Sequence, residues 1–183
     1  MDAKLKDLLV DKRSAISKGW FIAIMETYPT DTSGFMQKQQ DQFANPVGHT
    51  IRQGVEGLLD ALLEEKDFNE GMPFLDDIIK VRAVQDFTPS KAMSFIFLLK
   101  NVVHVELGKE IRQNQITDLL FSFESRIDDL ALFAFNIYVK CREQIYELKS
   151  EELKRMTHLL LKKSNLAYEI PAQELELKTK DNN

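Results

Sequence analysis

An apolar seam of helical spacing runs through the C-terminal half of the chain and constrains its fold more than any other feature. The seam residues follow one another at intervals of three or four: Leu119, Phe123, Ile127, Leu130, Ala134, Ile137, Cys141, Ile145 and Leu148. This spacing predicts one long amphipathic helix. A helix over these residues would be about 45 Å long, more than a compact domain of this size needs. We therefore expect part of it to project and its apolar face to meet a partner helix.

The rest of the chain has the same helical character. Apolar residues recur at helical spacing over residues 2–26, 46–62, 71–87 and 89–107. Asn45-Pro46 and Thr88-Pro89 each place a capping side chain before a proline, an arrangement that starts helices. Ser150, followed by two glutamates, indicates that another helix begins there. Only seven Gly and five Pro are present, which argues against a turn-rich β fold.

These patterns predict an all-α fold, a compact bundle of about six helices with a long C-terminal helix pair. Residues 1–168 should form a single helical domain, and residues 169–183 a polar, disordered tail. Gly48, Gly54 and Gly57 lie inside one predicted helix, where each costs about 1 kcal/mol relative to alanine. We expect another helix, or a ligand, to approach closely at these glycines.

Charge and composition narrow the possible partners and the location. The formal net charge is −5 and the isoelectric point is near 5.3, so we expect no nucleic acid partner. The charged N-terminal residues are unlike a signal peptide, and no window approaches the ~20 apolar residues of a membrane span. The single cysteine, Cys141, cannot form a disulfide within the chain, which fits a reducing compartment. We expect a cytoplasmic protein without membrane insertion.

No arrangement of residues indicates catalysis or metal binding. The three histidines, His49, His104 and His158, are not spaced to place two ligands on one helix face. The carboxylate pairs are adjacent in sequence, and neighbours on a helix diverge by about 100°. No phosphate-binding glycine loop or nucleophile motif is present. We therefore predict a protein that is not an enzyme and has no cofactor, with His104 as the axial ligand if it did bind haem.

Polar residues interrupt the apolar faces in two of the predicted helices, and these are the candidate site residues: Arg82, Gln85, Asp86, Asn136 and Arg142. A buried arginine must find a partner to survive desolvation. Arg82 or Arg142 could pair with a carboxylate as an internal clamp, or the same groups could line a groove that receives a signal ligand or a partner. Both interpretations remain open from the sequence.

The end of the long apolar seam is the candidate dimer interface. We predict that Ile137, Cys141, Ile145 and Leu148 form a seam between two copies of the chain. Cys141 would act there as a small apolar residue, because no histidine lies near it in the sequence to activate the thiol.

Four segments carry a resemblance to a known family. They read WFIAIMETYP at 20–29, FANPVGHTIRQGVEG at 43–57, DDIIKVRAVQDFTPSKAMSFIFLLK at 76–100 and DDLALFAFNIYVKCREQIYE at 128–147. With these segments the chain resembles the RsbRD N-terminal domain family, the N-terminal module of RsbT co-antagonist proteins, over about residues 5–165. The phrases FANPVG, RAVQDFTPS and YVKCRE carry most of the likeness.

The resemblance implies an all-helical sensory half of a stressosome-type protein, globin-like without haem and dimeric. In the family such a module normally precedes a sulfate-transporter/anti-sigma-antagonist (STAS) domain, which a switch kinase phosphorylates. This sequence has no alternating strand–helix region that could supply that domain. We therefore expect a stand-alone sensory or interaction module rather than a direct kinase substrate.

Three functional hypotheses follow. The first is a non-catalytic sensory or regulatory module that dimerises and contacts a protein partner. The second is a sensor that binds a small molecule or haem in a pocket between the helices predicted at 46–62, 89–107 and 119–148. The third is an accessory or assembly factor for a metabolic enzyme complex. The resemblance favours the first.

Overall fold

The computed structural model describes residues 1–65, 73–85, 87–114 and 117–164, and over these ranges the chain is helical with no strand. The all-α prediction is confirmed. The helices are α1 (Ala3–Asp11), α2 (Arg13–Met25), α3 (Thr30–Lys38), α4 (Pro46–Leu63), α5 (Pro73–Val84), α6 (Pro89–Met93), α7 (Phe95–Glu106), α8 (Gly108–Asn114) and α9 (Thr117–Lys163). They fall into two units, Met1–Arg142 and Glu143–Asn183, which are described separately.

The helices predicted at 2–26 and 89–107 are each divided in two. Lys12 separates α1 from α2, although its N–H still bonds the Leu8 carbonyl and its own carbonyl accepts from Ile16. Ser94 separates α6 from α7 in the same way, with an N–H bond to the Ser90 carbonyl. Because backbone bonding continues through both positions, these are local changes of direction that apolar periodicity does not reveal.

In place of the expected C-terminal helix pair the structure has one continuous helix, α9, of 47 residues. Ser150 lies inside it and starts no new helix. Serine in a helix interior costs only a few tenths of a kcal/mol, and the flanking Lys149, Glu151 and Glu152 are good helix formers. No glycine or proline occurs between Thr117 and Lys163 to end the helix.

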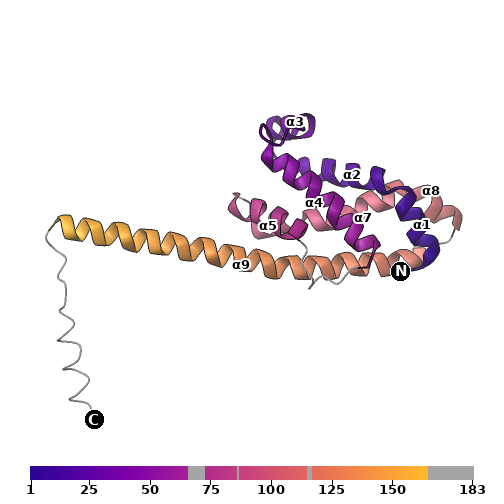
Figure 1. Cartoon of the computed structure of the whole chain (residues 1–183). Helices are drawn as coiled ribbons and strands as arrows, with labels where there is room; N and C mark the ends of the chain where they lie inside the picture. Colours follow the sequence, from indigo (N-terminus) through magenta and orange to yellow (C-terminus); the bar gives the residue numbers. More distant parts are fainter. Residues whose placement is uncertain (66–72, 86, 115–116, 165–183) are drawn as a thin grey trace, which may run out of the picture. The chain divides into compact units, whose positions relative to one another are not determined.

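The core of the first unit is built around α2, which packs against α7 and α4 (Figure 1). Trp20 on α2 is fully buried, and its ring stacks on Phe95 with centroids 6.5 Å apart. The indole Nε1 donates to the Phe95 carbonyl at 2.6 Å, which satisfies its only polar atom. This pair joins α2 to the first turn of α7.

The contact between α4 and α5 depends on two of the glycines singled out above. A Cβ at Gly54 would lie 2.5 Å from Ile78 Cδ1 and 3.2 Å from the Phe74 carbonyl oxygen. A Cβ at Gly57 would overlap the Phe74 ring. The expected close approach of another helix is therefore found at Gly54 and Gly57, whereas Gly48 faces the side chain of its own helix cap, Asn45.

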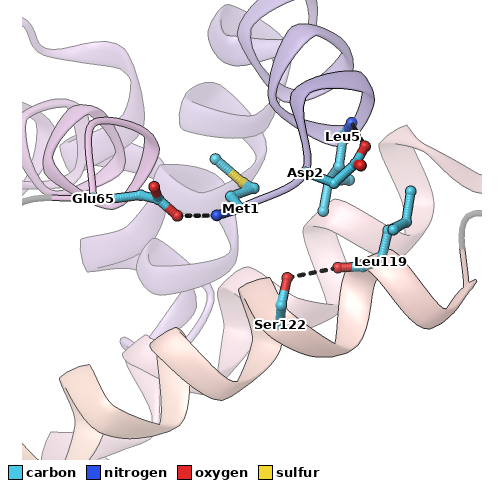
Figure 2. A network of polar contacts seen from close by, with 6 residues as sticks. All are labelled: Met1, Asp2, Leu5, Glu65, Leu119 and Ser122. Atoms are coloured by element: carbon cyan, nitrogen blue, oxygen red, sulfur yellow. Dashed lines mark hydrogen bonds and ion pairs between the residues drawn. The ribbon is translucent and has the colours of Figure 1, made fainter.

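The N-terminal end of the chain lies against the end of α4 (Figure 2). Asp2 caps α1 by accepting from the backbone N–H groups of Lys4 at 2.9 Å and Leu5 at 3.4 Å. The amino group of Met1 forms an ion pair with Glu65, which has a positive φ of 56° just beyond α4. Figure 2 also shows an early turn of α9, where the Ser122 hydroxyl donates to the Leu119 carbonyl at 2.9 Å.

The first part of α9 completes the core of this unit. The buried face of this part follows the predicted seam, with Phe123, Ile127, Leu130 and Ala134 at 0% exposure. Ion pairs join its other side to α7: Lys100 Nζ lies 2.7 Å from Asp128 Oδ1, and a second pair is formed by His104.

In the second unit, residues 143–163 are helical and nearly all of their side chains are exposed. The predicted tail at 169–183 and the predicted domain boundary at residue 168 lie outside the described residues and stay predictions. Within the described ranges, no helix is both long enough and apolar enough to cross a membrane.

Candidate functional site

Arg82 on α5 is fully buried, and it ties α5 to α6. Its Nε donates to the Ala92 carbonyl at 2.9 Å, and its Nη2 donates to the Lys91 carbonyl at 2.8 Å. Both carbonyls lie in the last turn of α6, where helix carbonyls need partners from outside the helix. The guanidinium supplies those partners.

Aromatic rings surround the other side of the guanidinium. The Arg82 Cζ atom lies 4.5 Å from the ring centroid of Phe87, 5.5 Å from that of Tyr28 and 5.6 Å from that of Phe95. A cation over aromatic faces is attracted by the ring quadrupoles, and the attraction is stronger where water is excluded. The positive charge of Arg82 is thus stabilised by aromatic rings and backbone carbonyls.

The sequence predicts that Arg82 or Arg142 pairs with a carboxylate as an internal clamp, or that these groups line a groove. Within the ranges that the structure describes, no carboxylate forms an ion pair with Arg82. Asp86, predicted beside it, lies outside those ranges. Burial lowers the pKa of Arg82 from its ordinary value, and Tyr28 opposes that change.

Tyr28 connects Arg82 to Gln85. The Tyr28 hydroxyl donates to Gln85 Oε1 at 2.9 Å and lies 3.5 Å from Arg82 Nη1. The Thr27 hydroxyl lies 3.4 Å from Arg82 Nη2. Burial raises the pKa of Tyr28, and the nearby Arg82 charge partly offsets this. We call Arg82, Thr27, Tyr28, Gln85 and Phe87 the Arg82 cluster.

A mostly apolar cavity of about 400 Å³ adjoins the Arg82 cluster. Its lining is Tyr28, Pro29, Thr32, Met36, Val47, Gln85 and Phe87. Its volume lies within the roughly 300–1,000 Å³ range of small-molecule sites, which combine apolar walls with a few polar groups. Here the polar groups are the hydrogen-bonded Tyr28 and Gln85.

The wall of this cavity is positioned by Asn45, which is 3% exposed. Asn45 Oδ1 accepts from the Gly48 N–H at 2.9 Å and caps α4. Its Nδ2 donates to the carbonyls of Met36 at 3.0 Å and Gln39 at 2.9 Å. One amide therefore fixes the start of α4 against the end of α3, which places Met36 and Val47 on the cavity wall.

Sequence reasoning missed Tyr28 and Phe87. Each directly precedes the N-cap of a helix, Pro29 for α3 and Thr88 for α6. Apolar residues at this position often pack back onto the helix that follows. That pattern is the signal that could have singled them out.

The structure brings together only some of the predicted groove residues. Arg82 and Gln85 belong to one cluster, as described above. The half-buried Arg142 donates from α9 to the Ala83 carbonyl at 2.9 Å, so it contacts α5 but lies outside the cavity lining. Asn136 is exposed on α9 and does not line this cavity either.

The four predicted dimer-seam residues differ in exposure. Cys141 is 8% exposed in the single chain, and burial together with the charge of Asp76 raises its pKa. Ile137 is half-buried in the first unit. In the second unit, Ile145 is half-buried and Leu148 is 67% exposed. Leu148 is therefore the most accessible of the four to a partner.

His104 lies at the surface. Its side chain is 53% exposed, and Nε2 lies 2.6 Å from Glu124 Oε1. It is not among the residues that line the cavities described in this section. In the described part of the chain, no group of three or more His, Cys, Asp or Glu side chains is placed to hold a metal ion.

A second apolar cavity, of about 390 Å³, lies on the first unit between α7 and α9. Three of its lining side chains are exposed large apolar groups, Phe97 at 47%, Leu132 at 69% and Phe135 at 51%. On α9 its lining residues are Asp128, Ala131, Leu132 and Phe135, and Ala131 is itself buried.

Comparison with known proteins identifies the family. A family model described as RsbT co-antagonist protein rsbRD N-terminal domain matches residues 14–153, which is more than half of the chain. The chain belongs to this family. The match to the rsbRD N-terminal domain contains the whole Arg82 cluster and extends past residue 143 into the second unit. Searches of curated proteins and of solved structures give no match.

Proposed function

We propose that this member of the rsbRD N-terminal domain family is a non-catalytic regulatory module that acts through protein contacts, including contact with a second copy of itself. Membership of a family named for RsbT co-antagonists supports a regulatory role of the stressosome type. Sensing and self-association are the finer parts of the proposal.

One observation carries the proposal, the exposed apolar side chains of the second unit. Between residues 143 and 163 six large apolar or aromatic side chains are more than half exposed: Tyr146, Leu148, Leu153, Met156, Leu159 and Leu160. An apolar helix face of this kind is stabilised when another helix covers it. Such a contiguous apolar surface is typical of a protein-interaction site.

The continuity of α9 gives the proposal a route for a signal. The same helix supplies buried core residues to the first unit and the exposed apolar residues of the second. In this proposal the first unit receives a signal, and the altered packing of α9 changes how its last 21 residues contact a partner.

The size of the protein in solution tests self-association. Light scattering at micromolar concentration should give twice the mass of one chain for the wild type. Leu153→Glu should give a monomer, because it places a charge on the exposed apolar face. His158→Glu adds the same charge about 140° around the helix and should leave the dimer intact. A monomeric wild type would refute self-association.

A second candidate function is favoured by the cavity beside the Arg82 cluster. Its apolar wall and the Tyr28–Gln85 pair suit a small apolar ligand with one polar group. Under this second proposal, the protein acts as a sensor by binding such a molecule between α3, α4 and the end of α5.

The fluorescent probe 1-anilinonaphthalene-8-sulfonate tests this second function. We expect it to bind the folded wild type, and Val47→Trp to reduce the binding at least several-fold by filling the cavity. Val10→Trp changes an exposed residue on α1 and should not alter binding. Equal binding by all three proteins would show that the cavity is not the site.

A further inference from the structure

The helix of the second unit has opposite charges in its two halves. Residues 143–152 contain four glutamates and one lysine, a net charge of −3. Residues 153–163 contain four Lys or Arg residues and no acidic residue, a net charge of +4. Leu153 lies at the boundary and is 66% exposed. The charges on this segment are therefore arranged as a linear dipole along the helix.

We infer that two copies of the chain pair antiparallel through residues 143–163. This inference rests on the self-association proposed above and adds the orientation and the surface. In an antiparallel pair the acidic half of each helix lies against the basic half of the other. In a parallel pair glutamates would face glutamates and lysines would face lysines. Opposite charges beside a helix interface favour pairing, and like charges oppose it.

The apolar face allows either orientation, so charge decides between them. Leu153, Met156 and Leu160 lie three, four and seven residues apart and share one side of the helix. The exposed large apolar side chains of the segment extend from Tyr146 to Leu161 and are therefore centred near Leu153, so two copies can cover each other's apolar face when they run in opposite directions about that midpoint. The partner that fits is thus a second copy of the same helix.

The inferred interface differs from the dimer seam that the sequence predicts. Cys141 is already buried in the first unit of the single chain, whereas the exposed large apolar residues of the second unit extend from Tyr146 to Leu161. The inferred interface is therefore shifted toward the C-terminal end of α9.

Distances between spin labels on the two copies test the orientation. The full chain carries Cys141→Ala, so that one introduced cysteine, Gln144→Cys or Ser150→Cys, takes the nitroxide label. With the midpoint near Leu153, antiparallel copies should place the labels at Gln144→Cys about 25–30 Å apart along the axis. Labels at Ser150→Cys, close to the midpoint, should be within roughly 15 Å in either orientation, given helix axes 8–10 Å apart.

The possible outcomes distinguish antiparallel pairing from self-association in general. A long distance at Gln144→Cys with a short one at Ser150→Cys supports antiparallel pairing. Short distances at both positions would overturn antiparallel pairing and leave self-association standing. A long distance at Ser150→Cys would move the interface to another surface, such as the apolar cavity between α7 and α9. An absence of dipolar coupling at both would refute self-association itself.

Salt gives an independent readout. Attraction between opposite charges weakens as the Debye length falls from about 10 Å at 0.1 M to about 3 Å at 1 M salt. Dimer affinity should therefore fall several-fold between 0.1 and 1 M sodium chloride. An affinity that rises with salt would mean that like charges meet at the interface, and would overturn the antiparallel arrangement.

Discussion

The guanidinium of Arg82 lies 4.5 Å from the centre of the Phe87 ring, within a fully buried site. The same guanidinium donates to two carbonyls of α6. This arrangement makes Arg82 a structural link between α5, α6 and the segment that contains Tyr28. Two of its neighbours, Tyr28 and Phe87, line the candidate ligand cavity.

Arg82→Lys should lower the free energy of unfolding by about 2–4 kcal/mol. A lysine keeps the charge but cannot donate to both carbonyls in the fixed directions of a guanidinium, so a buried carbonyl loses its partner. Chemical denaturation checks this. Arg112→Lys, at an exposed position on α8, should change the free energy by less than about 0.5 kcal/mol. Equal effects at the two positions would contradict the role given to Arg82.

Asn45→Asp separates the two roles of Asn45. Aspartate is a good N-cap, so the bond from the Gly48 N–H is retained, but the two donors to Met36 and Gln39 are lost. We expect a loss of about 2–4 kcal/mol, because two carbonyls lose a partner and face a carboxylate instead. Asp2→Asn, at the exposed cap of α1, should be nearly neutral. Thermal unfolding of both variants provides the comparison, and a neutral Asn45→Asp would mean that capping alone explains Asn45.

Gly54→Ala tests the close approach of α4 and α5. The new methyl group would lie 2.5 Å from Ile78, which is fully buried, so the two helices must separate. We expect a loss of about 1–3 kcal/mol from overpacking. Gly34→Ala in α3 has nothing within 4 Å and should gain up to about 1 kcal/mol from helix propensity. A stabilising Gly54→Ala would contradict the described packing.

Cys141 is the only cysteine, so a thiol reagent reports on one site. Burial raises its pKa above the ordinary value of 9.0. Its reaction with dithionitrobenzoate should be slow below about pH 9 in the folded protein and fast after unfolding. Since the folded pKa is the higher one, the thiol's contribution to stability is present below pH 9 and is lost as the pH rises above it. Cys141→Ala should remove that part of the alkaline decline.

The sequence predicted local features well and tertiary partners poorly. The cap and proline at Asn45-Pro46 and the apolar seam to Cys141 follow from spacing and capping rules, which act over a few residues. Arg82 was recognisable as a polar residue in an apolar helix. Its partners were not, because Thr27 and Tyr28 are more than 50 positions away and the Ala92 acceptor is a backbone atom.

The second unit also shows what can and cannot be predicted from the sequence. The seam predicted a helix beyond Cys141, and the structure has one. The exposure of Leu153 and Leu160 could not be read from the sequence, because a 3.6-residue pattern does not say whether the covering surface is the same chain or another. The Ser150 signal for a new helix was outweighed by the strong helix formers around it.

Hydrogen exchange in residues 143–163 at several protein concentrations tests the central claim most directly, because a helix with exposed apolar side chains opens easily unless a partner covers it. We predict that these amides exchange rapidly at nanomolar concentration and become protected at tens of micromolar, while amides in the core of the first unit stay protected throughout. Exchange in residues 143–163 that is the same at every concentration would contradict the proposal that this helix is the self-association surface.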